Sequence, residues 1–71
     1  MDDLGWFIGR LSDARRAFIR AFVRLDSSEA LRVLAGGDVT PRDSREMAEA
    51  VFCRDRLKKE RELFHLMFGV I

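Results

Sequence analysis

The sequence contains one cysteine and one histidine, and this scarcity excludes several kinds of protein. A single cysteine, Cys53, cannot form a disulfide within the chain. Cys53 and His65 are also the only soft metal ligands, whereas a structural zinc site normally takes several more. The sequence therefore predicts no disulfide, no metal site and no cofactor.

Long hydrophobic runs are also missing. The longest, residues 63–71, spans nine residues and includes His65, whereas a helix that crosses a bilayer needs ~20 apolar residues. The first residues, Met1-Asp2-Asp3, are acidic and lack the pattern of a secretory signal. The net charge of +1 gives no global field toward nucleic acid or a membrane. We therefore expect a cytoplasmic protein with no membrane partner.

A chain of 71 residues has little room for a core. Such a chain hides only about 60% of the surface that it exposes when unfolded. Domains below roughly 70–80 residues usually gain stability from disulfides, a metal or a second subunit. Because the first two are excluded, association remains, and a hydrophobic fraction of 48% is ample for a core plus an interface.

The first predicted helix covers residues 2–25. Its start is acidic, at the end where the helix dipole favours negative charge. Apolar residues recur at the spacing of an amphipathic helix. They gather on one broad face, which comprises Leu4, Phe7, Ile8, Leu11, Ala14, Phe18, Ala21, Phe22 and Leu25.

Two further helices are predicted. Asp26 followed three residues later by Glu29 is a helix-start signal for a short helix over residues 28–35, which Gly36 and the following glycine terminate. A third helix is predicted over residues 41–68, with Thr40 as its cap and Pro41 in its first turn.

Together these elements predict the fold class. The two long helices have similar lengths, about 36 and 42 Å, and a compact connector joins them. This pattern is typical of an antiparallel helical hairpin with the short helix at the bend. We therefore expect an all-α protein with one domain over residues 1–71, whose hairpins pair into a dimeric four-helix arrangement.

A catalytic site is not indicated. Cys53 and His65 are twelve residues apart on one predicted helix, which separates them by about 18 Å along its axis. They cannot form the nucleophile and base of an enzyme, because these must lie within hydrogen-bond reach. We interpret Cys53 as a core residue and His65 as a partly exposed helix-end residue, and we expect no catalytic residues.

The back of the first helix is the candidate partner-binding site. Its side chains lie roughly opposite Leu11 and Phe22, and three of its arginines recur at intervals of four residues. A solvated charged face with one incidental aromatic is the simpler interpretation. Exposed tryptophan with arginine is nevertheless the composition of binding hot spots. The candidate partner-binding residues are Trp6, Arg10, Arg16, Arg20 and Arg24.

Apolar residues surround the C-terminal end of the third helix. Phe64 and Phe68 continue the core face, whereas other apolar residues point away from it. One neighbouring helix cannot cover both sides, so a second subunit, a target or a folded-back tail must do so. The candidate dimer interface comprises Leu63, Leu66, Met67 and Val70.

Three arginines fall within the apolar arcs of their helices, namely Arg15, Arg54 and Arg61. Arginines at the rim of a hairpin can bury their stems and keep their charges in water. Alternatively, they specify the register or pairing of the helices.

These patterns favour a small regulatory protein-binding module that acts stoichiometrically, as an inhibitor or adaptor of another protein and as a homodimer. Arginine outnumbers lysine eleven to two, which is consistent with a bacterial or phage genome rich in GC. The alternative is a nucleic-acid-binding transcriptional regulator that uses the arginines of the first helix. Acidic residues Asp43, Glu46 and Glu49 on the helix that would enter the major groove disfavour it.

Overall fold

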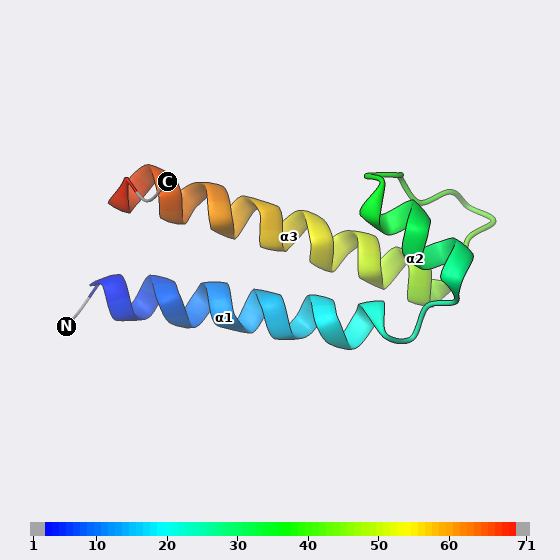
Figure 1. Ribbon diagram of the computed structural model, residues 1–71, viewed down its shortest axis with the longest axis horizontal. Helices are drawn as coiled ribbons and strands as arrows, with labels where there is room; N and C mark the ends of the chain where they lie inside the picture. The colour runs from blue at the N-terminus through cyan, green and yellow to red at the C-terminus, as the bar shows by residue number, and fades with distance from the viewer. Residues whose placement is uncertain (1–2, 70–71) are drawn as a thin grey trace.

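The computed structural model describes residues 3–69 and contains three helices, α1 (Asp3–Phe22), α2 (Ser27–Leu34) and α3 (Arg45–Phe68). The helices α1 and α3 lie side by side and antiparallel, and α2 packs on α3 at the closed end of the hairpin (Figure 1). The molecule is elongated, 44 × 19 × 18 Å. No strand occurs within residues 3–69. The predicted all-helical class and the pairing of the two long helices are confirmed.

The contact between α1 and α3 is centred on small side chains. Ala14 and Ala21 are the buried residues of α1, and Ala50 and Cys53 are among those of α3. The prediction placed the centre of this face nearer to Leu11, which is only half-buried. Small side chains allow two helices to approach closely, so the larger apolar side chains lie along both edges of the contact.

The rest of the core lies at the bend. Val33 of α2 and Met47 of α3 are fully buried there, and Val51 is nearly so. Partly buried hydrophobic side chains of the first half of the chain pack against this cluster: Ala17, Phe18, Phe22 and Leu25. The short helix therefore contributes a buried side chain as well as a connection.

The start of α2 confirms the predicted capping signal. The carboxylate of Asp26 accepts a hydrogen bond from the Glu29 N–H over 2.8 Å, and the Glu29 carboxylate accepts one from the Asp26 N–H over 3.3 Å. The helix ends before Gly36, whose φ of 83° lies in the left-handed region that favours glycine.

The end of α1 differs slightly from the prediction. Regular helix stops at Phe22 rather than Leu25. The N–H groups of Arg24 and Leu25 donate to the carbonyl oxygens three residues earlier, those of Ala21 and Phe22. Such bonds tighten the last turn of a helix, and they bring the chain around toward α2.

The start of α3 was predicted wrongly. The helix begins at Arg45, not at Pro41, and its cap is Ser44, whose hydroxyl accepts a hydrogen bond from the Met47 N–H. Residues 40–43 form a turn instead, closed by the Asp43 N–H to the Thr40 carbonyl. Both segments carry cap-type residues, and contacts from α2 decide between them.

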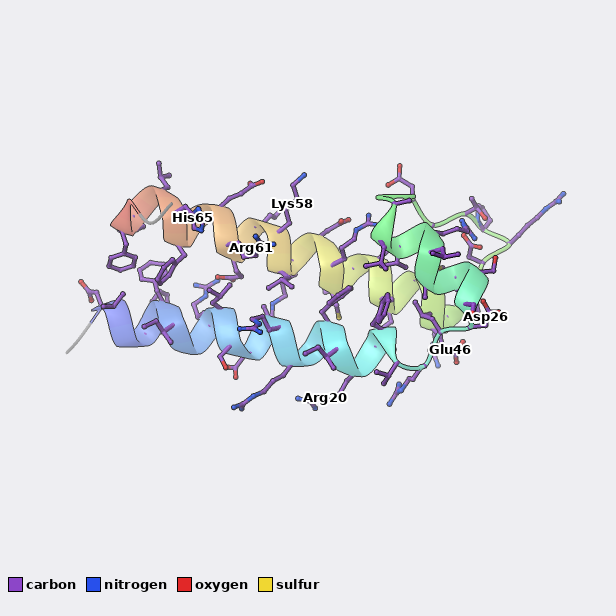
Figure 2. All side chains as sticks on the ribbon, in the orientation of Figure 1. Arg20, Asp26, Glu46, Lys58, Arg61 and His65 are labelled. Carbon is purple, nitrogen blue, oxygen red and sulfur yellow. The ribbon has the colours of Figure 1, made fainter. Side chains whose placement is uncertain are left out.

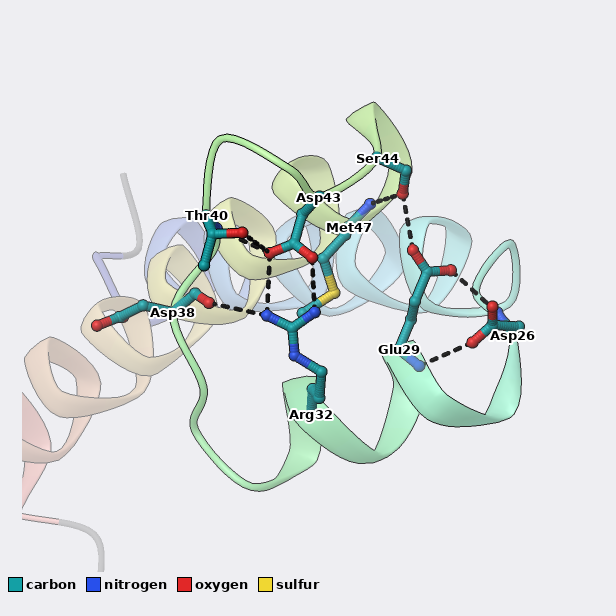
Figure 3. Close-up of polar contacts among 8 residues, drawn as sticks. All are labelled: Asp26, Glu29, Arg32, Asp38, Thr40, Asp43, Ser44 and Met47. Atoms are coloured by element: carbon teal, nitrogen blue, oxygen red, sulfur yellow. Dashed lines mark hydrogen bonds and ion pairs between the residues drawn. The ribbon is translucent and has the colours of Figure 1, made fainter.

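Those contacts come from two residues of α2 (Figure 3). The Arg32 guanidinium donates two hydrogen bonds to the Asp43 carboxylate, over 2.6 and 2.9 Å. The Glu29 carboxylate accepts a hydrogen bond from the Ser44 hydroxyl over 2.7 Å. Because Asp43 also accepts a bond from the Thr40 N–H over 2.7 Å, the turn is held closed and the helix starts after it.

Candidate protein-binding surface

Large apolar side chains are exposed on all three helices. The accessible surface is 5485 Å², compared with about 4,500 Å² for a typical folded monomer of 8.2 kDa. The excess is similar to the ~800 Å² that one protein contributes to a standard interface. Among residues 3–69, the exposed large apolar residues are Leu4, Trp6, Ile8, Ile19, Val23, Leu31, Leu34, Val39, Phe52, Leu66 and Met67.

Trp6 is among them, and its surroundings connect α1 with α3. Trp6 is 51% exposed, and its ring meets the Phe7 ring edge-on at 4.8 Å. The Arg10 guanidinium lies 4.8 Å from the centre of the Trp6 ring and donates a hydrogen bond of 2.6 Å to the Glu60 carboxylate of α3. Cation, aromatic ring and carboxylate thus form one connected group.

The position of Arg10 corrects part of the sequence analysis. It was placed on the outer side of α1, but it spans the two helices, and its carboxylate partner Glu60 is only 8% exposed. The reason is the shift of the contact toward Ala14, which brings Arg10 to the edge of the interface.

Leu63 lies beside this group. A surface hollow of about 500 Å³ is lined by Arg10, Phe52, Asp55, Arg56, Lys59, Glu60 and Leu63. Arg10 and Leu63 were predicted to belong to two separate surfaces, and the structure brings them together. Met67 is exposed and lies one turn after Leu63 on the same side of α3. We call Trp6, Arg10, Leu63 and Met67 the Trp6 surface.

Phe52 was not selected from the sequence, although it is 70% exposed and lines the same hollow. The signal was present in its position: Arg56 follows at i+4 and Lys59 at i+7, so Phe52 lies on the charged side of the helix. A phenylalanine there is as unusual as the tryptophan on α1.

The remaining arginines of the predicted site lie farther along α1. Arg16 and Arg20 are exposed, and Figure 2 shows Arg20 pointing away from α3. Arg24 approaches Glu49 of α3 to 3.9 Å. The five candidates therefore do not form one uniform face, because Arg10 and Arg24 face carboxylates of α3 whereas the others face solvent.

The candidate dimer residues are also divided. Leu66 is 81% exposed and lies farther around α3 than Leu63, which is half-buried. Met67 belongs to the Trp6 surface. Val70 lies outside the described residues.

Two residues considered for catalysis have separate positions. Cys53 is in the core, where burial raises the pKa of its thiol, and His65 is exposed near the end of α3. Within residues 3–69, no group of histidine, cysteine and acidic side chains is arranged to hold a metal ion. No helix in that range is both long and apolar enough to cross a membrane.

A second set of hollows flanks the α1–α3 contact on its other side. One, of about 410 Å³, is lined by Leu11, Arg15, Leu57, Arg61, Phe64 and His65. The next, of about 280 Å³, is lined by Phe18, Val33, Leu34, Arg54, Leu57, Lys58 and Arg61. They share Leu57 and Arg61 and are therefore continuous. We call this feature the basic-rimmed groove; sequence analysis did not identify it as a site.

Arg54 has a structural role at one end of this groove. Its guanidinium donates hydrogen bonds to the carbonyl oxygens of Val33 and Gly37, over 3.0 and 2.9 Å. A cation at the C-terminal end of a helix also interacts favourably with the helix dipole. Of the three arginines within apolar arcs, Arg54 thus fixes α2 on α3, whereas Arg15 and Arg61 line the open groove.

No known family model, curated protein or solved structure matches this chain. What the protein does therefore has to be inferred from its own surfaces.

Proposed function

We propose that this protein is a small regulatory protein-binding module, which forms a homodimer and binds another protein stoichiometrically as an adaptor or inhibitor. The observation that carries the proposal is the Trp6 surface. Trp6 and Met67 are exposed on it, beside the hollow that Arg10 and Leu63 line.

The composition of this surface supports protein binding. Tryptophan, methionine and arginine are enriched in protein interfaces, and tryptophan and arginine supply most hot spots. The Arg10 guanidinium is fixed by Glu60 and lies over the Trp6 ring. Side chains that are already ordered lose less entropy when a partner binds.

Self-association accounts for the exposed end of α3. Leu66 and Met67 are exposed there, and fully burying such a side chain is worth about 1.5–3 kcal/mol. A second copy that covers this end would supply stability that a two-helix contact built on alanines does not.

Sedimentation velocity tests the dimer over roughly one to one hundred micromolar protein. We expect a dimer whose melting temperature rises with concentration. The double variant Leu63→Glu/Leu66→Glu should be monomeric, whereas Val23→Glu, which changes an exposed apolar residue beyond the end of α1, should remain dimeric. A single wild-type species near 8.2 kDa with a concentration-independent melt would refute the dimer.

A nucleic-acid-binding regulator is the alternative, because Arg16 and Arg20 are exposed and have no ion-pair partner within residues 3–69. We expect duplex DNA at physiological salt to bind only weakly and nonspecifically, at or above roughly micromolar. A tighter, sequence-selective complex that Arg16→Ala/Arg20→Ala abolishes would replace the protein-binding proposal.

A further inference from the structure

The basic-rimmed groove lies across the α1–α3 contact from the Trp6 surface. Arg10 lines the hollow on one side, and Leu11, about 100° further around α1, lines the groove on the other. On α3, Glu60 lines the hollow beside the Trp6 surface, whereas the next residue, Arg61, lines the groove. A ligand in the groove would therefore not compete with a protein bound to the Trp6 surface.

The floor of the groove is apolar and only partly covered. Leu11 of α1 and Leu57 and Phe64 of α3 are half-buried there. Leu4 and Ile8 precede Leu11 at helical spacing and are exposed. The apolar floor therefore extends along α1 toward the open end of the hairpin.

A helix already occupies the other end of this groove. Val33 of α2 is fully buried against α3, and Leu34 borders the groove while remaining 67% exposed. In Figure 1, α2 covers the closed end of the hairpin and leaves the open end uncovered. The groove between α1 and α3 thus has a shape that accepts a helix. Its closed end is covered by α2, and its open end is not covered by any helix among residues 3–69.

The rim of the uncovered part is cationic. Arg15, Lys58, Arg61 and His65 line or border it, and no carboxylate lines either hollow. Figure 2 shows Lys58, Arg61 and His65 succeeding one another along α3. Two carboxylates lie near this rim: Glu62 lines an adjoining hollow of about 370 Å³ with Lys58, Arg61 and His65, and Asp55 pairs with Arg54 at the closed end of the groove.

The cations at the groove differ from the other positive groups around the core in their ion pairing. Arg15, Lys58 and Arg61 have no ion-pair partner within residues 3–69. In contrast, Arg32 and Arg54 each pair with an aspartate. The charges at the groove are therefore available to a ligand.

We propose that the uncovered part of the basic-rimmed groove binds an amphipathic helix of another protein, with acidic side chains along both edges of its apolar face. The incoming helix continues the cover that α2 begins. Its apolar side chains at i, i+3, i+4 and i+7 enter the hollows above Leu11, Leu57 and Phe64. Its carboxylates meet Arg15, Lys58 and Arg61.

A second copy of this chain fits the groove less well. The outer side of α1 carries Arg16 and Arg20, so docking it against Arg15 and Arg61 would bring like charges together, and that juxtaposition disfavours a partner. The proposal rests on the proposed function only in that the ligand is protein. It assigns a different surface from the one that forms the dimer.

Synthetic peptides test the proposal. The probe is an acetylated peptide of about 20 residues, longer than the ~12–15 residues below which an isolated helix is marginal in water, with leucines at i, i+3, i+4 and i+7 and glutamates along both edges. One control replaces every glutamate with lysine, and a second replaces the leucines with serine. Heteronuclear NMR titration should show the acidic peptide binding at least about tenfold more tightly than either control, with the shifted amides along the groove.

Paired variants locate the site. Arg61→Glu should weaken the acidic peptide by about tenfold, whereas Lys59→Glu, the same charge reversal on the hollow of the Trp6 surface, should leave binding within about twofold. Circular dichroism melts establish that both variants are folded. Leu57→Ser should also weaken binding, since it removes part of the floor.

Three results would overturn the proposal. The first is equal binding of the acidic and basic peptides, or none at millimolar concentration. The second is equal weakening by Arg61→Glu and Lys59→Glu. The third is conversion of the dimer to a monomer by Leu11→Glu, because that result would mean that a second copy of the chain occupies the groove. Failure of peptide binding with the dimer intact would leave the proposed function standing, whereas the dimer test at Leu63→Glu/Leu66→Glu changes residues of α3 that do not line the groove.

Discussion

Arg10 of α1 donates a 2.6 Å hydrogen bond to Glu60 of α3, whose carboxylate is the one buried charged group among residues 3–69. The same guanidinium lies over the ring of Trp6. Arg10 therefore serves the helix contact and the candidate surface together. A binding experiment on an Arg10 variant alone cannot separate the two roles, and stability has to be measured first.

Arg10→Met should lower the free energy of unfolding by about 1–3 kcal/mol, because it leaves the Glu60 carboxylate buried without its partner. The double variant Arg10→Met/Glu60→Leu should recover most of this loss, since an apolar pair avoids the cost of burying charge. Urea unfolding followed by circular dichroism measures both effects.

Arg24→Met is the matched control for Arg10. Its partner Glu49 is 3.9 Å away and both side chains are largely exposed, so the loss should stay below about 1 kcal/mol. Equal effects of Arg10→Met and Arg24→Met would mean that the pair with Glu60 does not stabilise the hairpin.

Trp6→Ala should weaken the complex with a target by about 2 kcal/mol or more, the usual order for a hot spot. The loss in stability should be small, because the ring is half-exposed and its contact with Arg10 is worth about 0.5–1 kcal/mol at an exposed site. Phe7→Ala is the control: Phe7 is half-buried and meets Phe68 of α3 at 5.5 Å. It should lower the melting temperature more than Trp6→Ala does. The reverse order would make Trp6 a core residue.

Arg54→Met should loosen α2 more than the contact between α1 and α3. The change removes both hydrogen bonds to the carbonyl oxygens of Val33 and Gly37, each worth about 1.5–3 kcal/mol when the donor is charged. Relative to wild type, the substitution should accelerate amide hydrogen exchange more in Ser27–Leu34 than in Asp3–Phe22. Arg56→Met, on the far side of α3, should change neither. Uniform acceleration would show that α2 and the hairpin unfold as one unit.

Asp43 should make stability depend on pH in acid. The hydrogen bond from Arg32, then that from the Thr40 N–H, lowers the pKa of Asp43 well below its ordinary 3.8. A lowered pKa contributes stability above the ordinary value and loses it as pH falls toward the folded-state value. The difference in melting temperature between wild type and Asp43→Asn should be constant above about pH 5 and shrink below about pH 4.

Asp13→Asn serves as the control for that titration. Asp13 is exposed and has no ion pair within residues 3–69, so the variant should melt close to wild type at every pH. A pH-independent difference for Asp43→Asn would mean that the turn needs the shape of the aspartate and not its charge.

Local signals in the sequence predicted the elements well where one choice was clearly favoured. Asp26 and Glu29 form both bonds of the predicted capping box. Gly36 ends α2 with a positive φ, as a glycine after a helix should. The start of α3 was ambiguous because Thr40 and Ser44 are both good caps. Arg32 decided between them by binding Asp43, and no local pattern contains that contact.

Helical spacing predicted faces less well than it predicted helices. It placed Trp6 and Arg20 on exposed surface, where they lie. It also placed Arg10 there, but the contact is centred on Ala14 and Ala21. A broad apolar arc does not determine which part meets the neighbour, because that depends on how closely the two backbones approach.

Sequence patterns alone were enough to predict that this chain is helical, that a capping box at Asp26 and Glu29 starts the short helix, and that apolar side chains exceed what one hairpin can cover, although the short helix spans Ser27–Leu34 and not residues 28–35. Local hydrogen bonding and the period of the helix are sufficient for these. Three relationships follow from packing between elements and from no local pattern: Arg10 pairs with Glu60, Arg54 holds α2, and Arg15 and Arg61 line one groove. The first and the last depend on the rotation of α1 against α3, which is set by small side chains that are distant in the chain, and the second depends on how α2 packs on α3.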